Sequence, residues 1–366
     1  MKALFFLTNA SNRGGTERTC FLICNELSKN GYEVHLFCIS GQSDNLAYQL
    51  DDKVHVHILN IEFNGIKLFL RLPYILFTLR QYILDHGIRF LIGVEAMSCL
   101  FTLPILPFVD RRKLKLILWE HFNFTVNLGI KSRDFCRRLA AKYADAVVTL
   151  TSKDREMWLE NLKPSAKLFT INNPSPFSTS KNSYPINSCD IIAVGRITHQ
   201  KGFDMLVRSW KLAEERIKQL PGNWRLSIIG DGEDKGELKE LINYLELNES
   251  IELVSNKSNI GSYYETAAFL CMTSRYEGLP MVLIEAQSYG LPIIAFDCLT
   301  GPAEIVDLES GTLCSTFDIA SFSDVIVEFA GDINKRKAMS ERAKILASRF
   351  HSDHIMGNWQ NMLESL

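Results

Sequence analysis

Short apolar runs alternate with helix-length amphipathic segments along nearly the whole of this 366-residue chain. Such runs are typical of buried strands, and their alternation with helical segments predicts βαβ units built on parallel sheets. Before residue 172 the expected strands are 3–8, 33–39, 54–59, 89–94, 114–119, 146–151 and 167–171. After residue 189 they are 190–197, 224–232, 250–255, 267–274, 292–297 and 311–315. The fold class is therefore α/β.

A segment rich in Pro, Ser and Asn, NNPSPFSTSKNSYPINS at 172–188, separates the two series. This composition is typical of an interdomain linker, and the chain is longer than a single hydrophobic core usually supports. We therefore expect two doubly wound, Rossmann-like domains facing each other across a cleft, at 1–172 and 189–349, joined by 173–188. Residues 350–366 have helical spacing, and we expect this helix to pack back on the first domain. Ligands of such folds bind outside the carboxyl ends of the strands.

Composition and charge narrow the class of protein. With 46% hydrophobic and 22% charged residues the chain resembles an ordinary soluble globular protein, and its net charge of −2 does not indicate nucleic acid as a partner. The charge is uneven, because residues 1–172 hold 22 Lys and Arg against 16 Asp and Glu, whereas the remainder holds 18 against 26. A basic first half is typical either of a surface for membranes and polyanions or of ordinary solvated faces.

The cysteines and the apolar segments indicate the compartment. Nine cysteines without a C-x-x-C pair argue against a disulfide framework or a zinc site, and we expect buried thiols in a reducing cytoplasm. The opening run MKALFFLTNA is too short for a signal peptide. The most apolar stretch, 66–84, is interrupted by three basic residues and a proline, which excludes a spanning helix. The sequence therefore predicts a cytoplasmic protein.

Two loops at expected strand ends have residues suited to phosphate. Gly14 and Gly15 follow the first strand and precede a helix, where bare backbone lets an anion approach the helix amides. A tight strand-to-helix turn would use the same glycines. In the second domain Arg196 and Lys201 lie five residues apart in VGRITHQKG, and two cations in one loop suit a diphosphate. Neither loop has the glycine spacing of a dinucleotide site or a P-loop.

Two carboxylates flank a helix start in TSRYEGLPMVLIEAQSYGLP at 273–292. We expect Glu277 in the loop after a buried strand, Pro280 at the first helical position, and Glu285 in the second helical turn. Carboxylates that accept from vicinal hydroxyls, beside bare amides for phosphate, suit a nucleotide sugar. The alternative interpretation is a solvated glutamate on a surface helix.

Several motifs together resemble the retaining glycosyltransferases of family 4, which have the GT-B fold. E-G-L-P-x-x-x-x-E at 277–285 is similar to the family's E-x7-E motif, and the GR…KG loop at 195–202, IGDG at 229–232 and TGPAEIV at 300–306 follow in the family's order. RGGTER at 13–18 resembles the family's N-terminal glycine loop. The resemblance covers most of the chain and is strongest over 190–310.

The resemblance implies roles for particular residues. Glu285 matches the residue that binds the nucleotide ribose, and Glu277 the residue that contacts the donor sugar. Arg196 and Lys201 match the pair that neutralises the leaving diphosphate. The stretch that approaches the donor corresponds to Gly278, Leu279, Pro280 and Met281, with Gly14 and Gly15 in the first domain. LWEHFNF at 118–124 more loosely matches the segment with a histidine near the anomeric carbon, which nominates His121, next to Glu120. We expect Arg196 and Glu285 to face a solvent-filled cleft rather than a core.

The activity implied is transfer of a glycosyl unit, with retained anomeric configuration, from a nucleotide diphosphate sugar to a hydroxyl. UDP-hexose or UDP-N-acetylhexosamine is the expected donor, and no metal or other cofactor is expected. Two alternatives stay open: a sugar-nucleotide 2-epimerase of the same fold, and a non-catalytic sugar-nucleotide-binding protein. The resemblance further implies a polyprenyl-diphosphate-linked saccharide as acceptor in O-antigen, capsule or exopolysaccharide synthesis.

Basic and apolar residues occur together in three segments of the first domain. These are 66–84 with Lys67, Arg71 and Arg80, DRRKLKL at 110–116, and KSRDFCRRLAAKY at 131–143. Basic amphipathic surfaces bind anionic lipid headgroups. Alternating basic and apolar residues are equally typical of any helix packed on a core. The sequence thus favours, without deciding, a peripheral location on the inner membrane face.

Overall fold

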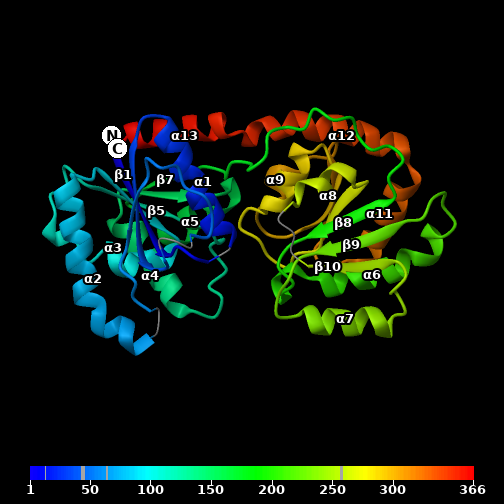
Figure 1. The fold of residues 1–366 in the computed structure, drawn as a ribbon, viewed down its shortest axis with the longest axis horizontal. Helices are drawn as coiled ribbons and strands as arrows, with labels where there is room; N and C mark the ends of the chain where they lie inside the picture. The colour runs from blue at the N-terminus through cyan, green and yellow to red at the C-terminus, as the bar shows by residue number, and fades with distance from the viewer. Residues whose placement is uncertain (13, 43–45, 63–64, 256–258) are drawn as a thin grey trace. The chain divides into compact units, whose positions relative to one another are not determined.

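The computed structural model describes residues 1–12, 14–42, 46–62, 65–255 and 259–366, with the side chains of 65–67 and 69 outside this description. The chain forms two compact units (Figure 1). The first unit contains residues 1–174 and 352–366, and the second contains residues 175–351. The chain therefore passes between the units twice.

A parallel sheet with strand order β3-β2-β1-β4-β5-β6-β7 forms the centre of the first unit. This confirms the α/β class predicted from the apolar runs. The strands are β1 (Lys2–Asn9), β2 (Glu33–Ser40), β3 (His55–Ile58), β4 (Phe90–Val94), β5 (Lys115–Trp119), β6 (Ala146–Thr149) and β7 (Lys167–Thr170). The helices are α1 (Gly15–Lys29), α2 (Gly65–His86), α3 (Cys99–Thr102), α4 (Lys131–Tyr143), α5 (Ser152–Leu162) and α13 (Ser352–Glu364), with short 3-10 turns at η2 (Ala96–Ser98) and η3 (Leu106–Phe108).

Neighbouring residues of β1 show that both faces of this sheet are covered. The Phe6 ring lies 6.0 Å from Phe37 and 5.5 Å from Phe101 of α3 on one face. The Phe5 ring lies 6.2 Å from Trp119 and 6.3 Å from Trp359 of α13 on the other. Strands buried on both faces are continuously apolar, which is why they read as short hydrophobic runs in the sequence.

The second unit has a parallel sheet with strand order β10-β9-β8-β11-β12-β13. Its strands are β8 (Asp190–Val194), β9 (Arg225–Ile229), β10 (Ile251–Val254), β11 (Phe269–Met272), β12 (Ile293–Asp297) and β13 (Gly311–Ser315). The helices are α6 (Phe203–Ile217), α7 (Lys235–Tyr244), α8 (Gly261–Thr266), α9 (Met281–Ser288), α10 (Pro302–Ile305), α11 (Ile319–Gly331) and α12 (Ile333–Ala347), with 3-10 turns η4 (His199–Lys201) and η5 (Ser348–Phe350). Aromatic pairs such as Phe269 with Phe329 of α11, 5.5 Å apart, pack the helices on the sheet.

Residues 175–188, most of the predicted linker at 173–188, instead pack on the second unit. The Tyr184 hydroxyl donates to Ala268 O at 2.6 Å and accepts from Arg336 Nε at 3.1 Å. The Ser188 hydroxyl donates to Thr266 O at 2.6 Å. These partners lie roughly 80 to 150 residues away in the chain, so the Pro- and Ser-rich composition of the segment could not reveal them.

Candidate functional site

In the second unit, the loops after the neighbouring strands β8 and β11 bring together two predicted site residues. Lys201 Nζ lies 2.6 Å from Glu277 Oε1. The side chains are 19% and 7% exposed, so the pair is largely removed from water. Because β8 and β11 are adjacent and parallel, their carboxyl ends meet at one edge of the sheet. A cation and a carboxylate thus share one position at that edge.

The loop that holds Lys201 is fixed by its neighbours. Gly202 has φ +64, and a Cβ there would lie 2.2 Å from Thr273 O, so this position requires glycine. The Thr273 hydroxyl donates to Gly202 O at 2.9 Å. Arg275 pairs with both Asp204 carboxylate oxygens at 2.9 and 2.8 Å and also donates to His199 O. A bidentate pair of this kind ties the β11 loop to the start of α6.

Two residues that the sequence analysis did not nominate support Glu277. The Gln200 amide donates to Tyr276 O at 3.1 Å and lies 3.5 Å from Glu277 Oε2. The Thr300 hydroxyl donates to the backbone oxygen of Glu277 at 2.5 Å. Thr300 belongs to the TGPAEIV motif, and that motif was the available signal for its position.

The start of α9 differs by one residue from the prediction. Pro280 is the N-cap, and the helix begins at Met281, so Pro280 is not the first helical residue as predicted. Leu279 is buried, and Gly278 and Met281 are half-buried. Gly301 packs closely against this turn, since a Cβ there would lie 2.4 Å from Pro280 Cδ.

Glu285 lies in the second turn of α9 but is not exposed, and the expectation that it faces solvent is wrong. It is 3% exposed, and the Tyr264 hydroxyl of α8 donates to its Oε2 at 2.8 Å. The Tyr264 ring is fully buried and stacks on Tyr289, 5.4 Å away. A buried carboxylate needs such donors, because an unpaired charge away from water is costly. Glu277 and Glu285 therefore have different partners.

Arg196 is exposed, as expected, but it pairs with Glu233 rather than sharing a partner with Lys201. Its Nη2 lies 3.1 Å from Glu233 Oε2, in the loop after β9, and the two side chains are 74% and 59% exposed. Exposed pairs contribute little to stability. The guanidinium is consequently available to exchange this carboxylate for another anion.

In the first unit His121 follows β5 and is buried. Its ring lies 4.3 Å from Trp119, and within the described part of the chain its Nε2 has no hydrogen-bond partner. Burial lowers the pKa of His121 to about 3. The imidazole is therefore neutral near pH 7, and a buried Nε2 of this kind suits a hydrogen bond with a ligand hydroxyl.

Glu120, beside His121, holds the loop rather than facing a ligand. Its Oε1 accepts from the His121 and Phe122 amides at 3.0 and 3.1 Å, and its Oε2 accepts from Arg137 Nε at 3.0 Å. Arg137 also donates to the backbone oxygens of Asn123, Phe124 and Val126. Both charged side chains are at most 1% exposed, and their hydrogen bonds replace the lost water.

Two further carboxylates, the half-buried Glu95 and the buried Asp154, follow the strands on either side of β5. Burial raises the pKa of Glu95, after β4, to about 7, and burial also raises the pKa of Asp154, after β6, to about 7. Glu95 has φ +71, and its Oε1 lies 2.7 Å from Arg133 Nη1. Groups that change protonation near pH 7 are frequent at functional sites. Sequence reasoning missed both, because their pKa values depend on burial and on charged groups of other elements, among them Glu120 and Arg137.

The glycine loop of the first unit has an ordinary backbone. Gly14 is the N-cap of α1 with φ −109, and a Cβ at Gly15 would meet open space. The fold therefore does not require glycine at position 15. Arg13, which precedes the pair in the RGGTER motif, lies outside the described residues.

Comparison with known proteins gives the family. Residues 178–345 match the family described as "Glycosyl transferases group 1", and residues 13–175 match "Glycosyltransferase Family 4". The amylovoran biosynthesis glycosyltransferase AmsD of Erwinia amylovora is 33% identical over 99% of both chains. This chain belongs to the GT-B glycosyltransferases.

Two other similar proteins cover the full length of this glycosyltransferase. A Campylobacter jejuni α-1,4-N-acetyl-D-galactosaminyltransferase, whose name specifies a saccharide-PP-undecaprenol substrate, is 26% identical over 99% of this chain and 98% of its own. Anabaena HepE in complex with UDP-glucose is 17% identical, with a TM-score of 0.79 over 100% of both chains. The second likeness shows the shared fold, and the predicted GT-B architecture is confirmed.

No helix in the described portion of the chain is both long and apolar enough to cross a membrane.

Proposed function

We propose that this glycosyltransferase moves a hexosyl or N-acetylhexosaminyl unit from a UDP sugar to a hydroxyl of a polyprenyl-diphosphate-linked saccharide, with retention. The observation that carries the proposal is the buried Lys201–Glu277 pair at the carboxyl ends of β8 and β11. A diphosphate entering there would take Lys201 as its counter-ion. Glu277 would then be released to accept hydrogen bonds from the sugar hydroxyls.

The charges of the second unit fit the departure of a diphosphate. Negative charge develops on the leaving oxygens, and Lys201 and Arg196 would stabilise it where it forms. Lys201 acts as a point charge, whereas the exposed Arg196 can fork onto two oxygens once it releases Glu233. Glu285, held by Tyr264, would bind the nucleotide ribose.

His121 would act from the first unit. A neutral imidazole whose Nε2 has no partner among the described residues can hydrogen-bond a donor-sugar hydroxyl without adding a positive charge beside the forming cation. Glu120 fixes the loop that presents it. Such an interaction would lower the barrier most if it strengthens in the transition state.

The relatives support the choice of donor and acceptor. HepE is described with UDP-glucose, and the Campylobacter enzyme with a PP-undecaprenol-linked saccharide. AmsD takes part in amylovoran biosynthesis, which supports a role in a surface polysaccharide such as O-antigen, capsule or exopolysaccharide. A cytoplasmic location, with a metal-independent reaction, belongs to the same proposal.

A donor and acceptor assay tests the proposal. UDP, GDP and ADP sugars are first screened by thermal shift, and a matched donor at ~100 times its Kd should stabilise the protein by about 2.7 kcal/mol. The matched donor is then incubated with and without polyprenyl-diphosphate saccharides, and the products are identified by mass spectrometry and NMR. An α-linked product from an α-linked donor supports the proposal. Epimerised donor alone would indicate the 2-epimerase, and binding without turnover would indicate the binding protein.

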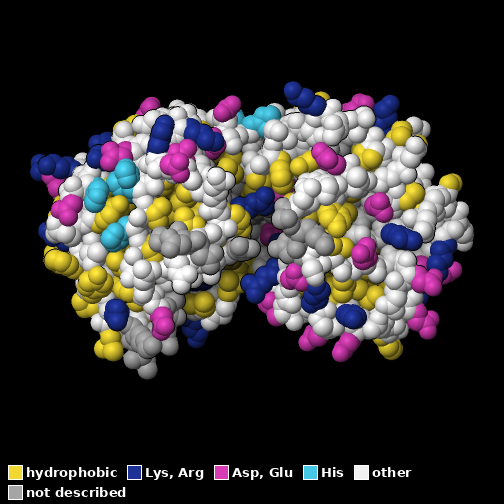
Figure 2. Space-filling model, in the orientation of Figure 1, with side chains coloured by type: hydrophobic (Ala, Val, Ile, Leu, Met, Phe, Trp, Pro, Cys, Tyr) yellow, Lys and Arg dark blue, Asp and Glu magenta, His cyan; other side chains and the backbone are white. Residues whose placement is uncertain are grey.

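We also propose that α2 places the first unit on an anionic membrane surface. Leu70, Tyr74, Phe77 and Leu84 are 73%, 55%, 63% and 46% exposed, and their spacing puts them on one face of the helix. Figure 2 shows hydrophobic side chains gathered over this part of the first unit. Arg71 is exposed on the same helix. The Lys67 side chain, which the sequence analysis included, lies outside the described residues.

Two of the five basic residues in the third segment, 131–143, are not exposed as expected. Arg133 and Arg137 of α4 are 7% and 1% exposed, because they pair with Glu95 and Glu120 inside the unit. Lys131, Arg138 and Lys142 of α4 are exposed and add to the basic surface, while α2 supplies the apolar face that the proposal tests. The membrane proposal predicts sedimentation with anionic vesicles at low salt and release at high salt. Phe77→Ser should weaken this binding, and Leu308→Ser, which changes an 89% exposed leucine of the second unit, should not. Equal binding by both variants would refute it.

A further inference from the structure

Four of the eight histidines gather at one edge of the first unit's sheet. His35 of β2 is opposite His55 of β3 in the strand register, and their rings lie 4.8 Å apart. His86 lies 5.2 Å from His35, and His57 lies 5.0 Å from Tyr82. The glycosyl-transfer chemistry uses none of these residues, and the sequence analysis did not connect them.

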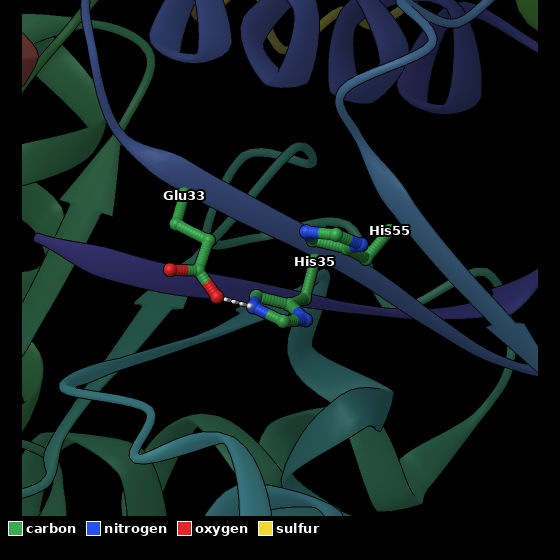
Figure 3. A group of neighbouring side chains, drawn as sticks. All are labelled: Glu33, His35 and His55. Carbon is green, nitrogen blue, oxygen red and sulfur yellow. Dashed lines mark hydrogen bonds and ion pairs between the residues drawn. The ribbon is translucent and has the colours of Figure 1, made fainter.

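The geometry points to a zinc-binding site formed by Glu33, His35 and His55. One ligand atom from each of the three residues lies within 4.8 Å of the other two. Figure 3 shows the Glu33 carboxylate directed at the His35 ring, with the His55 ring alongside. Zinc ligands at about 2.0–2.2 Å from the ion lie roughly 3.4 Å from one another. Small rotations of the exposed His55 and the half-buried Glu33 would therefore bring the three ligand atoms to the spacing that one zinc ion requires.

The strand pattern explains why these side chains converge. Glu33 and His35 are two residues apart on β2, so both point to the same face of the sheet. His55 is the register partner of His35 on the neighbouring edge strand, which places its side chain on that face as well. Two imidazoles and a carboxylate are a donor set that zinc accepts, with water in the fourth position.

His35 has the outer partner that metal-binding imidazoles usually have. Its Nδ1 lies 3.0 Å from the Tyr82 hydroxyl, and its Nε2 lies 3.3 Å from Glu33 Oε1. If Nδ1 carries the proton and donates it to Tyr82, the Nε2 lone pair faces the Glu33 carboxylate. A cation between the two acceptors would satisfy both, and the Tyr82 hydrogen bond would fix the ring orientation.

Lys2 competes for the same carboxylate. Its Nζ lies 2.9 Å from Glu33 Oε1, and both side chains are 40% exposed. Zinc binding therefore requires the ammonium group to turn toward water. This contact provides a test. If zinc binds to Glu33, removing Lys2 should strengthen zinc binding, whereas in a purely aromatic cluster that binds no metal it should not.

The position of the cluster separates it from the transfer reaction. Glu33 and His55 are the first residues of β2 and β3, at the amino ends of the strands. Gly14 and His121 instead follow the carboxyl ends of β1 and β5. The ion at this position would join the edge strand β3 to β2, and through Tyr82 it would contact the end of α2.

The test is zinc titration of the full-length, chelator-stripped protein without a histidine tag, followed by calorimetry. One zinc ion should bind per chain, and Glu33→Gln and His55→Gln should each lower the affinity by about tenfold or more. Both residues are partly or fully exposed, so these variants should fold. His354→Gln, which removes an exposed imidazole outside the cluster, is the matched control and should bind as the wild type does.

Two further measurements complete the test. Lys2→Met should raise the zinc affinity, and cobalt substitution should give a visible d–d spectrum without thiolate charge-transfer absorption. A thiolate band would place the metal on a cysteine and overturn the assignment. Absence of stoichiometric zinc binding, or equal affinity in Glu33→Gln, His55→Gln and His354→Gln, would show that the cluster is an aromatic packing feature only.

Discussion

The Lys201–Glu277 pair allows a quantitative prediction about the second unit. Lys201→Met removes the cation and leaves Glu277, whose side chain is 7% exposed, without its 2.6 Å partner. Breaking a buried pair from one side costs about 3–5 kcal/mol. Because Lys201 itself is 19% exposed, we expect the lower end, about 3 kcal/mol.

The double variant decides whether the loss reflects the charge pair. Glu277→Gln leaves an ammonium group that can turn to water, so it should cost about 1–2 kcal/mol. The double variant Lys201→Met with Glu277→Gln removes both charges, and its cost should not exceed that of Lys201→Met alone. The resulting coupling energy should be about 1 kcal/mol or more, in the range seen for residues in direct contact.

The assay must report on the second unit alone, because a chain with two compact units need not unfold in one step. Native-state hydrogen exchange of peptides from β8 and β11 gives the opening free energy of that sheet. Lys235→Met is a matched control, since Lys235 Nζ also lies 2.6 Å from a carboxylate, that of Asp231, but the side chains are 32% and 51% exposed. It should cost less than about 1 kcal/mol.

Two results would refute this reasoning. A coupling energy below about 0.5 kcal/mol would mean that the pair acts as a surface pair despite its burial. An equal cost for Lys201→Met and Lys235→Met would lead to the same conclusion. With UDP bound, the coupling should fall if, as proposed, the diphosphate becomes the partner of Lys201 in place of Glu277.

Three further predictions concern single residues. The unfolded pKa of His121 lies near 6.5 and its folded pKa near 3, so the unfolded chain takes up a proton first and stability is lost below pH 6.5. The first unit should therefore lose about 2 kcal/mol more between pH 6.5 and 4.5 in the wild type than in His121→Gln, measured by hydrogen exchange; equal losses would contradict the assigned burial. Tyr264→Phe removes the 2.8 Å hydrogen bond to buried Glu285 and should destabilise the second unit by about 1–3 kcal/mol in urea unfolding, so an unchanged midpoint would refute this contact. Arg196→Ala should change stability by less than about 0.5 kcal/mol, because its pair with Glu233 is exposed, yet weaken UDP binding about tenfold in calorimetry; unchanged affinity would remove Arg196 from the site.

Much of the fold could be predicted because a buried strand is apolar in its own residues. β1 and β12 are covered on both faces, so their buried residues, 3–7 and 293–296, are all apolar and the strands stand out without any tertiary information. The positions of Glu277 and Lys201 after such strands followed directly, because parallel strands place their carboxyl ends at one edge. The strand register that makes Lys201 and Glu277 a pair was the step that required the structure.

Exposure and partner choice could not be predicted from local sequence. Glu285 was expected to face solvent, but Tyr264 from a helix 21 residues earlier covers it. The sequence of α4 predicts that Arg137 is a basic surface residue, but in the structure it is buried and donates to Glu120, 17 residues away. In both cases the side chain that decides burial comes from another element.

The sequence by itself thus determined the alternation of strands and helices, the two-part organisation and the chemical types available at the strand ends. Tertiary structure alone decided which polar side chains meet, as the His35–His55 register and the Lys201–Glu277 contact show. The physical reason is the separation along the chain over which each effect acts. Periodic burial acts over a few neighbouring residues and is recorded in them, whereas electrostatic pairing depends on distances between segments that only the folded sheet brings together.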